Sequence, residues 1–209
     1  MSLQVKPFVL GRLKNNTYLL FDSAVKEGIV IDPSFEIEHL IDFVVENQVN
    51  ITGVWLTHAH FDHFAGLVAL RNQFPNLKTA LHPLDLPLWE KGGLSGLWNF
   101  NFEMNFTPEV PLQNGMVMAL GSHPLAVLHT PGHSPGHVVF YSDVLNCAFC
   151  GDLIFNMGVG RTDLPGGSEM DLLESITTKI FTLPPSTVLH SGHGPRTTVE
   201  KERANNPFI

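Results

Sequence analysis

Basic residues are scarce in this chain: 12 lysine and arginine residues stand against 20 aspartate and glutamate residues, a formal net charge of −8. Because nucleic-acid binding requires basic side chains that neutralise phosphates, the composition predicts no nucleic-acid partner. The chain also lacks an apolar run of the roughly 18 residues that a membrane-spanning helix needs. Residues 1–7 lack the apolar core of a signal peptide. We therefore expect a cytoplasmic protein without membrane contact that acts on a small-molecule substrate; its oligomeric state is left open.

Cysteine is nearly absent as well, with only Cys147 and Cys150. Their Cys-x-x-Cys spacing is typical of redox motifs and zinc ribbons. Both residues fall in a predicted strand, however, where side chains three apart point to opposite faces, so a disulfide or a shared ion does not fit. We interpret them as small buried residues and expect Cys150, two residues before Asp152, to line a site without binding metal.

Histidine, in contrast, is concentrated in one short segment. His58, His60, Asp62 and His63 directly follow the apolar run Ile51–Leu56, in the sequence Thr-His-Ala-His-Phe-Asp-His. Imidazole nitrogens and carboxylate oxygens are ligands of zinc, iron and manganese. A polar loop that is merely rich in histidine is the alternative, but packing gives no reason to gather so many there. The segment therefore predicts a metal site.

Three later residues of the same kinds, His133, Asp152 and His193, each follow a short apolar run and sit beside glycine. Such runs, bounded by Gly and Pro, predict strands. Functional groups gather beyond the carboxyl ends of strands, where loops converge. Four strand-end loops are thus expected to bring together donors for two ions. The expected metal ligands are His58, His60, Asp62, His63, His133, Asp152 and His193.

The donor set also predicts the chemistry of the site. It contains no thiolate, so the ion can be zinc, iron or manganese, and we expect one or two divalent ions with zinc favoured. Such ions lower the pKa of bound water from about 15.7 to about 7 and polarise a carbonyl group. Asp62 is the candidate catalytic residue, because a carboxylate that does not bind metal can orient the attacking water or accept its proton.

The order of these motifs resembles that of the metallo-β-lactamase superfamily. Within it, residues 151–155, 160–167, 192–198 and 206–208 are similar to the small glyoxalase II-like (hydroxyacylglutathione hydrolase-like) enzymes. The resemblance covers essentially the whole chain. It implies an α/β (α+β) fold of the four-layer αβ/βα sandwich type, formed as a single domain by residues 1–209. It also implies one ion on His58, His60 and His133, a second on Asp62, His63 and His193, and Asp152 as the bridge.

The resemblance further implies hydrolysis of thioesters, with S-lactoylglutathione as the reference substrate, by attack of a metal-bound hydroxide. A thiol has a pKa of about 8.5, so it can leave as a thiolate without a strong acid. Full-length glyoxalase II enzymes add a C-terminal helical domain that contacts glutathione, and this chain has no room for it after His193. The alternatives are a persulfide dioxygenase with one iron on His58, His133 and Asp152, another superfamily hydrolase acting on lactones or esters, and a non-enzymatic metal-storing module.

Four residues are candidates for contacts around the ligands or with substrate: Asp32, His137, Cys150 and Arg161. Asp32 can orient a metal-bound imidazole through its N–H group, or can be a simple turn residue. His137 lies in the His133 loop and is expected to pack behind the ligands. Arg161 is expected to form an ion pair with Asp163, with a contact to a substrate anion as the alternative.

Apolar spacing predicts helices over Phe35–Asn47, with Ser34 as N-cap, over His63–Phe74 and over Glu169–Phe181. Residues 91–113 differ from their surroundings, because apolar and polar residues alternate from Trp98 to Phe106. Period two predicts an extended arm that covers the core. A flap over the metal pocket or a subunit contact is the alternative.

Overall fold

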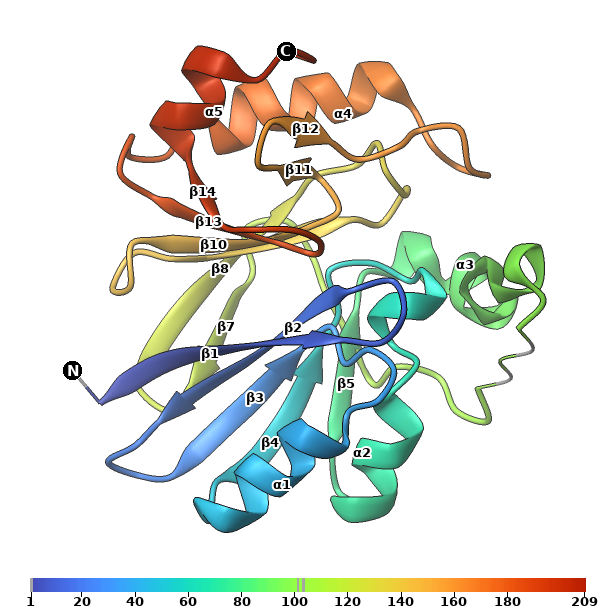
Figure 1. The fold of residues 1–209 in the computed structure, drawn as a ribbon, viewed down its shortest axis with the longest axis vertical. Helices are drawn as coiled ribbons and strands as arrows, with labels where there is room; N and C mark the ends of the chain where they lie inside the picture. The colour runs from blue at the N-terminus through green and yellow to red at the C-terminus, as the bar shows by residue number, and fades with distance from the viewer. Residues whose placement is uncertain (1, 101, 103) are drawn as a thin grey trace.

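The computed structural model describes residues 2–100, 102 and 104–209, whose strands form two six-stranded sheets (Figure 1). The first sheet has the order β1-β2-β3-β4-β5-β6 and the second β14-β13-β10-β9-β8-β7. The strands of the first sheet are β1 (Leu3–Leu10), β2 (Asn15–Asp22), β3 (Glu27–Ile31), β4 (Asn50–Trp55), β5 (Lys78–Leu81) and β6 (Val110–Pro111). Those of the second are β7 (Val117–Leu120), β8 (His123–His129), β9 (Val138–Ser142), β10 (Cys147–Gly151), β13 (Val188–Ser191) and β14 (Thr197–Thr198).

Helices cover the outer face of each sheet. The α-helices are α1 (Glu38–Glu46), α2 (Leu67–Gln73), α3 (Leu86–Glu90), α4 (Glu169–Ser175) and α5 (Val199–Asn205). The 3-10 segments are η1 (Phe61–His63), η2 (Pro83–Asp85) and η3 (Gly92–Trp98), and η4 (Ile176–Ile180) is a π-helix. A small hairpin pairs β11 (Ile154–Phe155) with β12 (Gly158–Val159). Figure 1 shows α1 and α2 against the first sheet and α4 and α5 against the second.

The strand pattern explains why the sheets bury both faces. Successive side chains of a strand point to opposite faces, and in β2 the neighbours Leu19 and Leu20 are both fully buried. Leu19 packs in the cluster beneath α1 and α2, whereas Leu20 packs in the cluster between the two sheets. A third cluster joins the second sheet to α4 through Leu172. The predicted four-layer αβ/βα sandwich is therefore confirmed.

Two predicted helices begin elsewhere than the sequence suggested. The first starts after Ile37, and Ser34 is a fully buried residue whose N–H donates to the Thr17 hydroxyl, so the prediction of Ser34 as N-cap was wrong. The predicted helix His63–Phe74 is in fact η1 followed by α2. The chain packs too tightly at Gly66 for a longer side chain, since a Cβ there would lie 2.2 Å from the Ser34 carbonyl oxygen.

The prediction of an extended arm over residues 91–113 that covers the core was wrong for the conformation of residues 92–98 but right for the packing. Leu94, Phe102, Met104 and Phe106 lie against the core cluster of the first sheet. Gly92–Trp98 forms 3-10 turns, and only Val110–Pro111 pairs as a strand, alongside β5. Residues 101 and 103 lie outside the described part of the chain. Gly92, Gly93 and Leu94 all have a positive φ, which an extended strand does not allow, and a Cβ at Gly93 would meet the Phe61 nitrogen at 2.4 Å.

None of the helices in residues 2–100, 102 and 104–209 is both long and apolar enough to cross a membrane.

Truncating the core between the first sheet and its helices should destabilise the fold. Leu40 on α1 is fully buried, so Leu40→Ala should lower the free energy of unfolding by about 2–5 kcal/mol through lost burial and the cavity left behind. Val45, on the same helix and 53% exposed, provides the control, and Val45→Ala should change stability by less than about 0.5 kcal/mol. Urea unfolding followed by circular dichroism measures both, and equal losses would contradict this layer assignment.

Candidate metal centre

The loops that follow four strands carry all seven candidate donors to one place. His58, His60, Asp62 and His63 follow β4, and the last two lie on η1. His133 follows β8, Asp152 follows β10 and His193 follows β13. Because β4 belongs to the first sheet and the other three strands to the second, the donors meet where the two sheets end together.

The first group of donors consists of three buried histidines. Ligand-type atoms of His58, His60 and His133 lie within 4.8 Å of one another. His60 Nδ1 and His133 Nε2 are 2.8 Å apart. Burial, followed by the nearby His133, lowers the pKa of His60 to about 3, and burial also lowers the pKa values of His58 and His133. The environment therefore favours the neutral imidazoles that metal binding requires.

The second group combines one carboxylate with two histidines. Ligand-type atoms of Asp62, His63 and His193 also lie within 4.8 Å of one another. His193 Nε2 is 3.2 Å and His63 Nε2 is 3.8 Å from Asp62 Oδ2. Burial alone would lower the pKa of His63, but the carboxylates of Asp152, Asp62 and Asp32 raise it well above its usual value. This group therefore attracts a positive charge.

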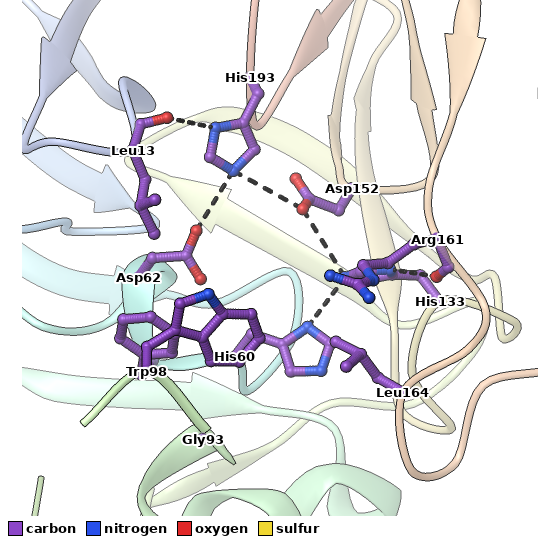
Figure 2. A pocket seen from close by; sticks show the side chains of 11 residues that line it. Leu13, His60, Asp62, Gly93, Trp98, His133, Asp152, Arg161, Leu164 and His193 are labelled. Atoms are coloured by element: carbon purple, nitrogen blue, oxygen red, sulfur yellow. Dashed lines mark hydrogen bonds and ion pairs between the residues drawn. The ribbon is translucent and has the colours of Figure 1, made fainter. Parts of the chain in front are cut away.

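Asp152 lies between the two groups (Figure 2). Its Oδ2 is 3.7 Å from His133 Nε2 in the first group and 3.7 Å from His193 Nε2 in the second, and its Oδ1 is 3.3 Å from His63 Nε2. Gly192 makes this approach possible, because a Cβ at that position would lie 2.3 Å from Asp152 Oδ1. A carboxylate so placed can contribute an oxygen to each of two ions.

Buried atoms without partners show that this centre fits a metal ion. His58 Nε2, His63 Nε2 and Asp152 Oδ1 are buried and make no well-aligned hydrogen bond within the described part of the chain, although the last two atoms lie 3.3 Å apart. Such atoms cost about 1–3 kcal/mol each when unsatisfied. Divalent ions with nitrogen and oxygen ligands would satisfy them, so the donor set fits such ions.

Contacts behind the donors fix their orientation. His133 Nδ1 donates to the Arg161 carbonyl oxygen at 2.8 Å, and His193 Nδ1 donates to the Leu13 carbonyl oxygen at 3.1 Å. Asp32 Oδ2 lies 2.9 Å from His63 Nδ1, while its Oδ1 accepts from the Thr57 backbone N–H. Because a carbonyl can only accept, Nε2 of His133 and of His193 is left to face the centre. Asp32 thus orients an imidazole and also braces the turn before it.

Of the other predicted contact residues, Arg161 lies in the pocket and His137 lies behind the donors. Arg161 lines the pocket, and the predicted ion pair is present, with Arg161 Nε 2.7 Å from Asp163 Oδ1. His137 is buried behind His58, with the ring centres 5.3 Å apart, and its Nδ1 lies 2.9 Å from the Thr130 hydroxyl.

The expectation that Cys150 lines the site was wrong. Its thiol packs in the hydrophobic cluster between the second sheet and α4, whereas Cys147 packs between the sheets. The two side chains therefore point to opposite faces, as their spacing predicts, and burial raises the pKa of both thiols, to about 12 for Cys147. The structure places these cysteines in the core and away from the pocket lining.

Asp85 is a residue that the sequence analysis missed. Its buried carboxylate accepts from the Ala59 N–H at 2.9 Å, from the Ser134 hydroxyl at 2.8 Å and from the Gly136 N–H at 2.5 Å. Asp85 thus ties the loop of His58 and His60 to the loop of His133. Its place after Pro83 is typical of a helix start, and no spacing rule relates it to the donors.

A pocket of about 260 Å³ opens onto the donors. Leu13 and Trp98 lie on one side of it, and Arg161 and Leu164 lie on the other (Figure 2). His60, Asp62, His133, Asp152 and His193 all contribute to the lining. A small molecule in this pocket would contact both donor groups at once.

The similarity of this chain to known proteins includes all seven donors. The family model described as metallo-beta-lactamase superfamily matches residues 10–193. Hydroxyacylglutathione hydrolase GloC of Haemophilus influenzae is 33% identical over 216 residues, 100% of this chain and 98% of that protein. The BLEG-1 B3 metallo-beta-lactamase has a TM-score of 0.90 at 36% identity, covering 98% of this chain and 99% of that one. TTHA1623 in a di-iron-bound form has a TM-score of 0.86 at 40% identity, covering 98% and 100%.

Replacing Asp85 should loosen the donor arrangement without removing a donor. Asp85→Asn keeps the volume but turns an amide N–H₂ toward buried donors, so we expect zinc affinity to fall about 10- to 100-fold. Competition with a chromogenic chelator measures the affinity. Asp42, exposed on α1, provides the control Asp42→Asn. Equal zinc affinity in the two variants would contradict a positioning role for Asp85.

Proposed function

Since this chain belongs to the metallo-β-lactamase superfamily, we propose that its pocket hydrolyses thioesters such as S-lactoylglutathione or related acyl thiols. The superfamily makes it a metallo-hydrolase, and similarity to a hydroxyacylglutathione hydrolase over the whole chain supports the thioester class. The observation that carries the proposal is the position of Asp152 between two complete groups of three donors. Such a centre could hold two ions next to an open pocket.

The donor groups define which residues would hold the ions. His58, His60 and His133 would hold one, Asp62, His63 and His193 the other, and Asp152 would bridge them. We propose zinc, with iron or manganese as alternatives, because all donors are imidazoles and carboxylates. When bound, such ions supply a hydroxide at neutral pH and polarise the thioester carbonyl.

Asp62 has a second proposed role: if it does not hold the second ion, it is the catalytic carboxylate. Burial alone would raise its pKa, but His63 and His193 lower it overall, so the group stays ionised at neutral pH. It lies on the pocket wall with Oδ2 facing His193. From there an ionised carboxylate can orient the attacking water and accept its proton.

The rest of the pocket wall fits a thiolate leaving group. Apart from the donors, the lining residues in the described part of the chain are apolar or glycine except for Arg161, whose pKa is too high for proton donation. An amine leaving group needs a proton donor, whereas a thiol with a pKa of about 8.5 can depart as thiolate. The wall thus supports thioesters over amides, and lactones and other esters remain alternative substrates.

A persulfide dioxygenase with one iron on His58, His133 and Asp152 is the alternative from another reaction class. The presence of the second group, Asp62, His63 and His193, supports hydrolysis instead, because a single-iron oxygenase needs only one set of ligands. Oxygen consumption with glutathione persulfide, together with iron as the only bound metal, would favour the alternative.

Removal of the bridging carboxylate should abolish most of the activity. Zinc-loaded protein should release free thiol from S-lactoylglutathione, and Asp152→Asn should lower kcat/KM by about 100- to 1,000-fold, comparable to loss of one transition-state contact. A thiol-reactive dye measures release, and Asp42→Asn is the control, expected to match the unaltered protein. Thiol release that is equal in the unaltered protein and the Asp152→Asn variant would contradict the proposal.

The number of bound ions should depend on the second donor group. We expect two divalent ions per chain in the purified protein and one in a His193→Ala variant, because the second group then keeps only Asp62 and His63 as its own ligands. His39, exposed on α1, provides the control His39→Ala, which should retain two ions. Mass spectrometry of the metals after gel filtration gives the counts, and one ion in every variant would count against a two-ion centre.

A further inference from the structure

A second cavity lies directly beside the metal pocket. Its volume is about 430 Å³, and its walls are Arg12, Leu13, Phe35, Glu36, Trp98 and Phe100. Leu13 and Trp98 also line the metal pocket, so the two spaces share a boundary. The two spaces therefore adjoin at these two side chains.

The walls of this cavity are anchored to the metal-motif loop. Phe61, which stands between His60 and Asp62 in the sequence, has its ring centre 5.3 Å from that of Trp98 and 5.9 Å from that of Phe35. Phe100 packs 5.5 Å from Phe35. Packing on Phe61 therefore fixes the position of these aromatic side chains relative to the metal donors.

The apolar side chains of the cavity remain partly exposed. Leu13, Trp98 and Phe100 are 43%, 38% and 40% exposed. Covering such side chains with an apolar ligand is favourable, by about 0.8 kcal/mol for each methylene buried. A charged group would instead lose water against a wall that is mostly aromatic and aliphatic, and the opposite charges of Arg12 and Glu36 would attract and repel it at once.

We propose that this cavity binds the acyl chain of the substrate, an apolar acyl group of about four to eight carbons. A cavity of about 150 Å³ already admits benzene, so about 430 Å³ has room for such a chain. The thiol carrier then lies on the opposite side of the donors, toward Arg161 and Leu164 (Figure 2). This inference rests on the proposed thioester hydrolysis and names the substrate class for it.

The direction of the substrate follows from the difference between the two sides. Glutathione carries two carboxylates, which would lose water in the mostly apolar cavity, where Arg12 attracts and Glu36 repels them, but would reach solvent on the side of the Arg161–Asp163 ion pair. An aliphatic chain would instead favour the apolar cavity, where it is removed from water. The carbonyl carbon would then stand over the donors, with its apolar substituent past Leu13 and Trp98.

Two series of thioesters test this assignment with the zinc-loaded protein. In the first, glutathione is constant and the acyl group grows from acetyl through butanoyl and hexanoyl to octanoyl. In the second, acetyl is constant and the thiol is an alkanethiol of two to eight carbons. We expect kcat/KM to rise at least about tenfold from acetyl to octanoyl, since a fully buried methylene is worth about fourfold, and to stay flat in the second series. A rise only in the second series, or in neither, would overturn the proposal.

A variant of the cavity wall separates chain binding from general effects. Phe100→Ala should lower the octanoyl-to-acetyl ratio of kcat/KM by about three- to tenfold, because it removes part of the apolar wall. Phe208, 60% exposed at the end of the chain, provides the matched control, and Phe208→Ala should leave the ratio unchanged. The same ratio in both variants would contradict a role for Phe100.

A binding measurement keeps the inference testable if no thioester is cleaved, the result that would refute the proposed function. Of the three tryptophans, Trp55 and Trp89 are buried, so Trp98 at the cavity boundary should dominate any response to a ligand. Octanoate, the product of the longest acyl substrate, should change tryptophan fluorescence saturably, and acetate should not. The change should disappear in Trp98→Phe. An equal response to both acids would overturn the acyl-chain assignment independently of activity.

Discussion

The structure depends on holding buried imidazole and carboxylate side chains close together at the metal centre. Asp152 stands between His133 in one donor group and His193 in the other, and all three are largely buried. Collecting imidazoles and carboxylates away from water is unfavourable unless cations or hydrogen bonds compensate. Neighbouring residues make hydrogen bonds to these side chains, and the nitrogen and oxygen donors that remain can bind cations.

The fold achieves this by ending strands of both sheets at the same edge. Each donor follows a strand whose residues are fixed by packing on both faces, so the loops inherit a defined position. Backbone carbonyls and buried carboxylates then orient the rings. Asp32 acts within one loop, whereas Asp85 joins two loops that come from different sheets. The metal centre therefore depends on the packing of both sheets.

The environment of the pocket is asymmetric, and this asymmetry bears on substrate choice. One side consists of Leu13, Trp98 and the aromatic cavity behind them, and the other of Leu164 and an exposed ion pair. A thioester has two different substituents on a single carbonyl carbon. For the proposed thioester substrate, sides of different polarity would distinguish the acyl group from the thiol, with the carbonyl carbon at the donors between them.

Much of this site could be predicted because its chemistry is local in the sequence. His58, His60, Asp62 and His63 lie within six residues, and Gly-His and Gly-Asp turns after apolar runs identify the other donors. Apolar runs likewise predicted the strands, because burial on both faces leaves such runs continuous, whereas the four layers were implied by the family resemblance. The donor types and their order along the chain are readable from residue identity alone.

What only the tertiary structure decided are features that arise between distant segments. Asp85 resembles a helix-start residue until the loops of Ala59 and Gly136 are seen to meet it. The alternation from Trp98 to Phe106 indicates an extended arm, yet Gly93 turns the chain where it packs on the metal-motif loop. Cys150 is close to Asp152 along the chain but faces the opposite layer. Residue identity determined which groups this protein can bring to a metal, whereas their hydrogen-bond partners and the cavity beside them depend on contacts between segments that no local pattern relates.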